Sequence, residues 1–105
     1  MPFIVNYESL DREVYASILD RPGIIPGNIE DLIPYGDDSF HCLPYIDPYD
    51  TTYFTKRQMA IFLSEWERVK ARAETPAQLV AWDSVYQLAK CVAEHPHSFL
   101  VFRGD

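Results

Sequence analysis

Residues 55–94 of this 105-residue chain, TKRQMAIFLSEWERVKARAETPAQLVAWDSVYQLAKCVAE, contain two helix start signals. Thr55 is followed three residues later by Gln58, which is the pattern of a capping box. The stretch TPAQ at residues 75–78 repeats this pattern and places proline in the first turn, where its missing N–H costs least. The sequence therefore predicts two neighbouring helices that are joined by a very short connection and run antiparallel.

Apolar residues recur at intervals of three or four through both helices, as expected when one side of each helix is buried. The first stripe consists of Met59, Phe62, Trp66, Val69 and Ala73. The charged residues of the same helix mostly occupy other directions: Lys56, Arg57, Glu65, Arg68, Lys70 and Arg72. The second stripe consists of Leu79, Trp82, Val85, Leu88, Ala89 and Val92. We expect the second helix to end near Glu94, before Pro96.

Strands are predicted at both ends of the chain. Residues 2–8 place successive side chains on opposite faces, and the alternation resumes at residues 14–18 after a turn at residues 10–13. This pattern favours a β-hairpin, and a short helix capped by Ser9 is the alternative. Residues 98–103 predict a final strand that pairs with the hairpin.

Residues 20–54 are rich in proline and glycine, which makes long regular elements improbable. Regularly spaced apolar residues predict that the segment is nevertheless ordered, as a loop-rich cover with a short strand or turn. A segment of this kind is more often functional than an average loop. The predicted fold class is α+β for a single acidic domain, residues 1–105. Its elements are an N-terminal β-hairpin, a loop-rich cover, an antiparallel helix pair and a C-terminal strand that completes a small antiparallel sheet.

The negative charge lies in the first half of the chain. The formal net charge is −7, and residues 1–54 hold ten acids but only two bases. This balance argues against nucleic acid as a partner, and no apolar stretch approaches the ~20 residues of a membrane helix. The first residues lack the features of a secretion signal, so we expect a cytoplasmic location. Such a surface would attract a basic partner, unless the acidic loops only maintain solubility.

Tyrosines and carboxylates occur together in the second part of the cover. Tyrosine offers broad contact with a polar tip, and aspartate accepts hydrogen bonds from arginine or lysine. We therefore expect the amino-terminal carboxylates to gather into one patch beside tyrosine rings. The candidate partner-binding residues are Asp37, Asp38, Tyr45, Asp47, Tyr49 and Asp50. Some rings are expected to seal the core instead: Tyr53 and Phe54 buried, Tyr49 exposed.

No sequence motif indicates catalysis, a metal or a cofactor. Cys42 and Cys91 lie far apart without a Cys-x-x-Cys spacing, and we expect free thiols, with Cys91 buried in the second helix. Neighbouring residues of an extended segment point in opposite directions, so His41 and Cys42 are not expected to share a proton. His95 and His97 are placed to cap the end of the second helix.

The stretch IDPYDTTYF at residues 46–54, followed by LSEWE at residues 63–67, resembles a group of small bacterial proteins. Their pattern is an Asp-Pro-Tyr-x-x-Thr-x-Phe turn before a helix, and the ending FLVFRGD at residues 99–105 is also similar to theirs. Asp50 stands where these proteins usually have glycine. Some members resemble immunity proteins of bacterial toxin systems, so the resemblance implies a toxin-neutralising role.

These observations favour a non-catalytic protein-binding domain. In this interpretation the chain is an immunity protein that neutralises a toxin by covering a basic site. One alternative is a small enzyme or divalent-metal-binding protein that uses His41, Asp47 and Asp50. Another is a homodimeric regulatory or structural subunit.

Overall fold

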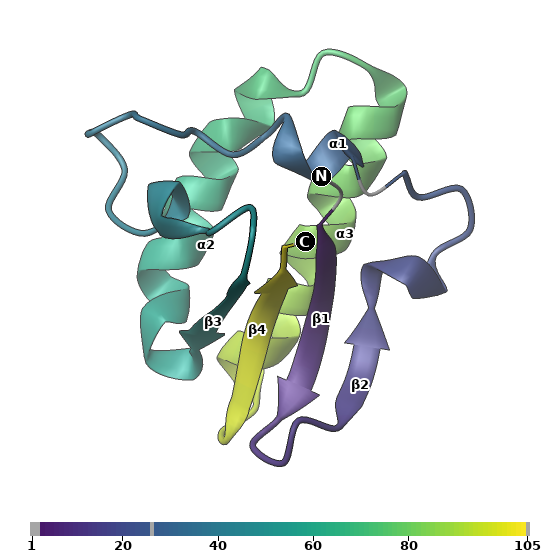
Figure 1. Ribbon diagram of the computed structural model, residues 1–105, viewed down its shortest axis with the longest axis vertical. Coiled ribbons are helices and arrows are strands. Elements are labelled where there is room, and N and C mark those ends of the chain that lie inside the picture. Colours follow the sequence, from purple (N-terminus) through teal and green to yellow (C-terminus); the bar gives the residue numbers. More distant parts are fainter. Residues whose placement is uncertain (1–2, 26, 105) are drawn as a thin grey trace.

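The computed structural model describes residues 3–25 and 27–104, so Pro2 of the predicted first strand and Pro26 of the predicted cover lie outside it. Its sheet has four strands, each antiparallel to its neighbours in the order β2-β1-β4-β3 (Figure 1). The strands are β1 (Ile4–Ser9), β2 (Val14–Ser17), β3 (Thr51–Thr55) and β4 (Ser98–Arg103). The helices are α1 (Gly27–Glu30), α2 (Met59–Val69) and α3 (Pro76–Glu94). The predicted α+β class is confirmed.

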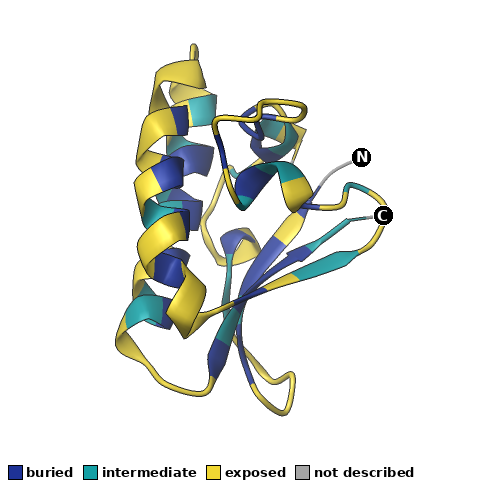
Figure 2. Ribbon diagram, turned by 90° about the vertical axis from the view of Figure 1, so that its left-hand side faces the viewer, coloured by how far each residue is buried: buried dark blue, intermediate teal, exposed yellow. Residues whose placement is uncertain are grey.

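Helices α2 and α3 pack on one face of the sheet, and the apolar core fills the layer between (Figures 1 and 2). Aromatic rings join the layers: Phe54 of β3 lies 5.1 Å from Phe62 of α2, and Phe102 of β4 lies 5.9 Å from both, measured between ring centroids. Residues 18–50 connect the hairpin to β3 as the predicted loop-rich cover, with α1 as a single helical turn. This cover lies across the end of the domain that also holds the chain termini (Figure 1).

The helix caps form as predicted. The backbone N–H of Gln78 donates to the hydroxyl of Thr75 (3.1 Å), and the N–H of Thr75 donates to the Gln78 side chain (3.1 Å). The N–H of Thr55 donates to the Gln58 side chain (2.7 Å), and one 3₁₀ turn then leads into α2. At the other end of α3, His95 Nδ1 lies 2.7 Å from a carbonyl oxygen of the last turn. This contact confirms the capping role predicted for His95.

A reciprocal tryptophan contact joins the two helices. Trp66 Nε1 donates to the carbonyl oxygen of Trp82 (3.0 Å), and Trp82 Nε1 donates to that of Trp66 (2.7 Å). Both side chains are buried, and a buried indole N–H needs an acceptor. Each tryptophan supplies the acceptor that the other requires, which fixes the register of the antiparallel pair.

Several predicted details are wrong. Tyr53 is 37% exposed because it points to the sheet face opposite the helices, where its ring meets Phe99. Leu79 is 42% exposed because it lies in the first turn of α3, beside the exposed connection between the helices. Cys91 is only half-buried. The alternative helix at the hairpin does not form, since residues 14–17 pair with β1.

An ion pair links a buried carboxylate of the first strand to the last strand, in which the arginine side chain is 36% exposed. Glu8 of β1 is fully buried, and Arg103 Nη2 of β4 lies 2.8 Å from each of its carboxylate oxygens. Asn6 donates a further hydrogen bond to Glu8 (3.1 Å). One of the acids counted from the sequence as surface charge is therefore buried and neutralised inside the domain.

We expect Arg103→Met to lower the free energy of unfolding by about 3 kcal/mol, because it leaves the carboxylate of Glu8 buried and unpaired. Arg21→Met is the matched control: Arg21 pairs with Asp83 at 3.0 Å, but both side chains are more than 40% exposed. The control should cost about 1 kcal/mol or less. Urea denaturation measures both values, and equal losses would contradict a special role for the buried carboxylate of Glu8.

Candidate functional site

A buried carboxylate on α2 holds the middle of the cover. Glu65 is 4% exposed, and its oxygens accept hydrogen bonds from three consecutive backbone N–H groups, those of His41 (2.6 Å), Cys42 (3.0 Å) and Leu43 (3.2 Å). Burial alone would raise the pKa of Glu65, but these hydrogen bonds outweigh it and hold the pKa below its usual value. The charge of Glu65 thus fixes a segment that has little regular structure of its own.

Arg68, one turn further along α2, anchors the preceding residues. Its guanidinium donates to the carbonyl oxygen (3.0 Å) and the hydroxyl (2.9 Å) of Ser39, and it lies 4.0 Å from the centre of the Phe40 ring. Ser39 in turn donates to Asp37 through its hydroxyl (2.7 Å) and its N–H (2.9 Å), which lowers the pKa of Asp37. Residues 37–43 are therefore attached to α2 through two charged side chains.

We expect Glu65→Gln to cost about 2 kcal/mol at neutral pH, because an amide oxygen replaces the charged acceptor of three N–H groups. Glu67→Gln, at an exposed position of the same helix, is the matched control and should be near neutral. The pKa of Glu65 is lowered on folding, so its stabilisation is present above the ordinary pKa of 4.5 and is lost as the pH falls through the folded value. Urea denaturation at several pH values should show the difference between wild type and variant shrinking below pH 4.5. A difference independent of pH would contradict this account.

Two adjacent hollows lie on the anchored part of the cover. One has a volume of about 490 Å³ and is lined by Glu30, Tyr35, Pro44, Tyr45, Ile46, Asp47, Pro48 and Tyr49. The other has a volume of about 300 Å³ and is lined by Gly36, Asp37, Asp38, Phe40, His41, Pro44 and Tyr45. Tyr45 and Pro44 belong to both. We call the tyrosines and carboxylates around them the tyrosine face: Glu30, Tyr35, Asp37, Asp38, Tyr45, Asp47 and Tyr49.

Five of the six candidate residues of the sequence line one of these hollows. Asp50 lines neither; its side chain accepts from the N–H of Thr51 (2.7 Å) and its carbonyl oxygen accepts from the N–H of Gly104 (2.8 Å). Tyr45 is 77% exposed and Tyr49 is 73% exposed, as predicted for Tyr49. The structure thus brings the predicted residues together as a surface and gives Asp50 a role in turn geometry.

The turn that carries Asp47 and Tyr49 is held from two sides. Asp47 accepts a hydrogen bond from the N–H of Tyr49 (2.8 Å), and its own N–H donates to the hydroxyl of Thr52 (2.9 Å). Behind the turn, Gly104 approaches so closely that a Cβ placed on it would lie 2.5 Å from the carbonyl oxygen of Pro48 and 2.7 Å from that of Asp47. The absence of a side chain at residue 104 is therefore what lets the turn sit against the end of β4.

We expect Gly104→Ala to lower the free energy of unfolding by about 1–3 kcal/mol, because backbone atoms would have to move to admit the methyl group. The amide signals of Asp47, Tyr49 and Asp50 should shift in NMR spectra. Gly27→Ala is the control, since a Cβ there meets no atom within 4 Å, and it should be neutral or slightly stabilising. Unchanged amide signals in Gly104→Ala would show that the turn does not depend on this approach.

The larger hollow has a negative electrostatic environment. Burial, together with the charges of Glu30 and Asp47 and the neighbouring Tyr49, raises the pKa of Tyr35 to about 12. Asp47 uses Oδ1 for the N–H of Tyr49, and no hydrogen bond among the described residues uses its Oδ2. The hollow therefore combines three tyrosine rings with a carboxylate oxygen that remains available as an acceptor.

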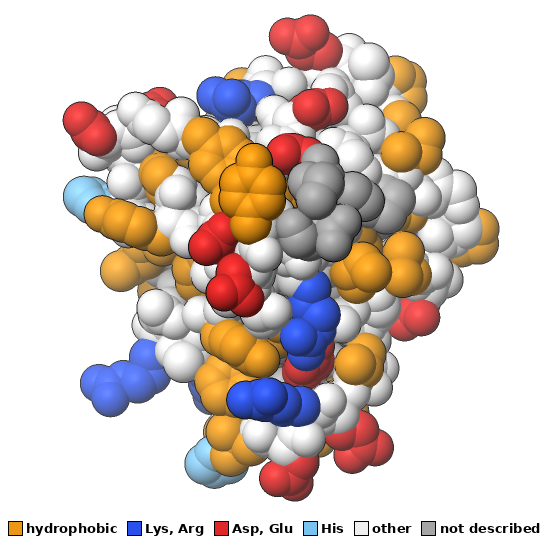
Figure 3. All heavy atoms as spheres, in the orientation of Figure 1, with side chains coloured by type: hydrophobic (Ala, Val, Ile, Leu, Met, Phe, Trp, Pro, Cys, Tyr) orange, Lys and Arg blue, Asp and Glu red, His pale blue; other side chains and the backbone are white. Residues whose placement is uncertain are grey.

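The amino-terminal acids do not form the single patch that the sequence predicted. Only four of the ten, Glu30, Asp37, Asp38 and Asp47, line the two hollows. Glu8 is buried against Arg103, and Figure 3 shows acidic side chains distributed around one face of the molecule with basic side chains between them. The correction follows from the fold, because the turn between β1 and β2 lies at the end of the sheet opposite the cover (Figure 1).

Neither of the two hollows is lined by all three residues of the enzyme or metal-binding alternative, His41, Asp47 and Asp50. Within residues 3–25 and 27–104, no three His, Cys, Asp or Glu side chains form a group that could hold a metal ion. His41 lines the smaller hollow and Asp47 the larger one. Both cysteines are free thiols, and burial, the charge of Glu65 and its hydrogen bond raise the pKa of Cys42 to about 12, so this thiol stays protonated at neutral pH.

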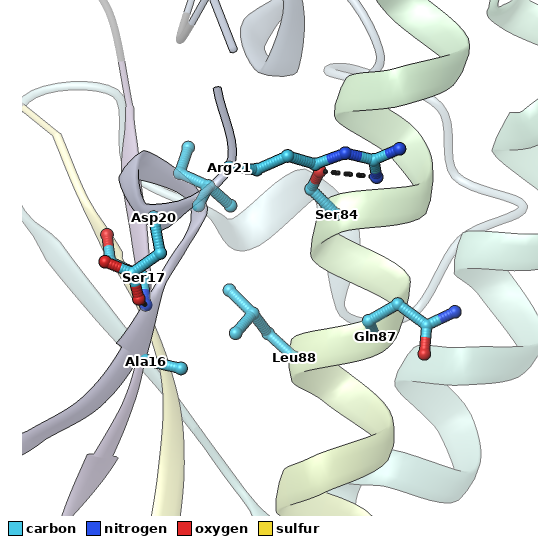
Figure 4. Close-up of a pocket in the computed structure, with 8 residues that line it drawn as sticks. Ala16, Ser17, Asp20, Arg21, Ser84, Gln87 and Leu88 are labelled. Carbon is cyan, nitrogen blue, oxygen red and sulfur yellow. Dashed lines mark hydrogen bonds between the residues drawn. The ribbon is translucent and has the colours of Figure 1, made fainter. Parts of the chain in front are cut away.

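A third hollow, of about 250 Å³, lies between the end of β2 and α3 (Figure 4). The guanidinium of Arg21 donates a hydrogen bond to the hydroxyl of Ser84 on α3 (3.1 Å) and forms an ion pair with Asp83 (3.0 Å). Leu88, also on α3, points toward the hollow (Figure 4). Ser84 donates its own hydroxyl proton to the carbonyl oxygen of Val80 (2.8 Å). These polar groups link the start of the cover to α3, so we assign this hollow a structural role.

Sequence reasoning missed Glu65, which it grouped with the outward-facing charges. The spacing did contain a signal, because Glu65 follows Phe62 by three residues and precedes Val69 by four, and all three are buried. A carboxylate within an apolar stripe indicates a buried acceptor that needs donors.

None of the helices in the described part of the chain is long and apolar enough to cross a membrane. Comparison with models of protein families, with curated protein sequences and with solved structures finds no match to this chain.

Proposed function

We propose that this chain is a non-catalytic protein-binding domain that covers a basic site of its partner with the tyrosine face. The observation that carries the proposal is the pair of adjacent hollows, in which exposed tyrosine rings and carboxylates lie on a firmly anchored segment. Tyrosine is enriched at protein interfaces because its large ring contributes contact area and loses little rotamer freedom. The carboxylates add acceptors for arginine and lysine.

The anchoring supports binding because ordering a mobile loop would reduce the affinity. Glu65 and Arg68 fix residues 37–43, and the contact between Gly104 and Pro48 fixes the following turn. The backbone that carries the tyrosine face is therefore already ordered in the free protein. A preformed acidic surface also speeds the encounter with a basic partner, an effect that salt weakens.

The biological role that fits this surface is neutralisation of a toxin in the cytoplasm. The resemblance of residues 46–54 to small bacterial proteins, some similar to immunity proteins, points in this direction. A nuclease would suit the charge, because an active site that binds phosphates is basic and is blocked by an acidic protein surface. Occlusion of that site requires no chemistry from the chain itself.

We expect the triple variant Asp37→Asn, Asp38→Asn, Asp47→Asn to associate with the partner at least about tenfold more slowly at low salt, and with a weaker salt dependence. The partner is first purified by its association with the wild-type protein and identified. Stopped-flow measurements then compare the association rates. Asparagine retains the side-chain acceptors that Asp37 and Asp47 use locally, so the turns should persist.

The control variant carries Asp11→Asn, Glu13→Gln and Glu94→Gln, which are exposed and lie outside both hollows. It has the same net charge as the triple variant and should associate nearly as fast as the wild type. If the two variants slow association equally, the partner responds to overall charge and the tyrosine face is not the binding site. A partner that is not inhibited by the wild-type protein would rule out neutralisation.

A further inference from the structure

The larger hollow of the tyrosine face has the components of a site for one cationic side chain. Three tyrosines, Tyr35, Tyr45 and Tyr49, line it together with the acidic residues Glu30 and Asp47. The face of an aromatic ring carries negative charge density, which attracts a cation placed over it. A ring surface alone would accept many apolar groups, but rings combined with carboxylates favour a cation.

We propose that this hollow receives the guanidinium group of a single arginine side chain of the partner. The inference rests on the proposed function and names the contact at the centre of that interface. Pro44, Ile46 and Pro48 line the hollow with apolar surface on which the methylene groups of the arginine can lie. The planar guanidinium can stack on a tyrosine ring while its N–H groups reach the unoccupied Oδ2 of Asp47.

Arginine suits this arrangement better than lysine for two reasons. An ammonium group is a compact and strongly hydrated charge, whereas a guanidinium is weakly hydrated and loses less solvation energy in a partly apolar hollow. The guanidinium also presents several donors in one plane, so it can contact a ring face and a carboxylate at the same time.

The shape of the hollow does not depend on a ligand. Ile46 is buried in the core, and the N–H groups of Tyr45 and Ile46 donate to the carbonyl oxygens of Cys42 and Leu43 (3.1 and 3.2 Å). Asp47 fixes the backbone of Tyr49. Because three of the lining residues are held by these contacts, isolated arginine derivatives should bind without the rest of the partner, although weakly.

The test uses the full chain and three probes, the N-acetyl N-methylamides of arginine, lysine and citrulline. Citrulline has the shape of arginine without its charge. NMR titrations at matched ionic strength follow the ring signals of all seven tyrosines. We expect arginine amide to shift the signals of Tyr35, Tyr45 and Tyr49 in a saturable manner and to bind about fivefold more tightly than citrulline amide.

Variants locate the binding in the hollow. Tyr49→Leu keeps an apolar side chain without a ring, and Asp47→Asn keeps the local acceptor without the charge, so each should weaken arginine binding severalfold. Tyr15→Leu and Asp11→Asn are the matched controls, since both residues are exposed and lie at the hairpin. These controls should bind arginine amide like the wild type.

Three results would overturn the inference: ring signals that do not shift up to the solubility limit of arginine amide, equal binding of citrulline amide, or lysine amide binding as tightly as arginine amide. Any of them would leave the proposed function intact if the triple aspartate variant still slows association with the partner. Conversely, normal association of that variant would remove the proposed function even if arginine amide binds to the hollow.

Discussion

The shape of the tyrosine face depends on one buried carboxylate. Glu65 lies on the inward side of α2. Its carboxylate accepts hydrogen bonds from three consecutive backbone N–H groups of a segment without extended regular structure. Three donors that converge on one anion resemble the backbone nests that bind anions in other proteins, with the anion here supplied by the chain itself. Burying a charge is unfavourable unless donors surround it, so the segment and Glu65 require each other. Pro44 and Tyr45 follow the anchored residues directly, and the tyrosine face takes its position from this contact.

Acidic residues perform three different tasks in this small domain. Glu8 and Glu65 are buried and hold strands or loops in place. The side chains of Asp37 and Asp47 accept hydrogen bonds from nearby backbone N–H groups and so stabilise turns. Each of these residues also lines a hollow. The net charge of −7 is therefore a poor description of the surface, because two of the negative charges, those of Glu8 and Glu65, are buried and form internal contacts. The carboxylates that line the two hollows beside tyrosine residues form a smaller, local group.

The features that the sequence predicted correctly are those determined within a few residues. The capping patterns at Thr55 and Thr75, the alternating strands and the apolar stripes all depend on local spacing. They form as expected except at Leu79, which is exposed. The pairing of β4 with the hairpin was also predicted correctly, because strands at the two ends of a short chain have few other strands to pair with. The candidate residues of the tyrosine face were found by composition alone.

The features that could not be predicted depend on contacts between distant segments. The exposure of Tyr53 depends on which face of the sheet α2 and α3 cover, and residues 51–55 carry no sign of that choice. The partner of Glu65 lies 22 to 24 residues earlier in the chain. The burial of Glu8 required Arg103 at the opposite end. Charge counted along a sequence cannot show such pairings, which is why the expected single patch did not form.

The tryptophan contact between α2 and α3 has an optical consequence. Trp66 and Trp82 are the only tryptophans of the chain, and both are buried where the two helices meet. Their emission therefore reports on the integrity of the helix pair, whereas the tyrosines around the hollows belong to a separate part of the molecule. Excitation at wavelengths that only indole absorbs follows unfolding without interference from the surface proposed to meet a partner. The chain thus contains a natural fluorophore for its core that is spatially distinct from the tyrosine face.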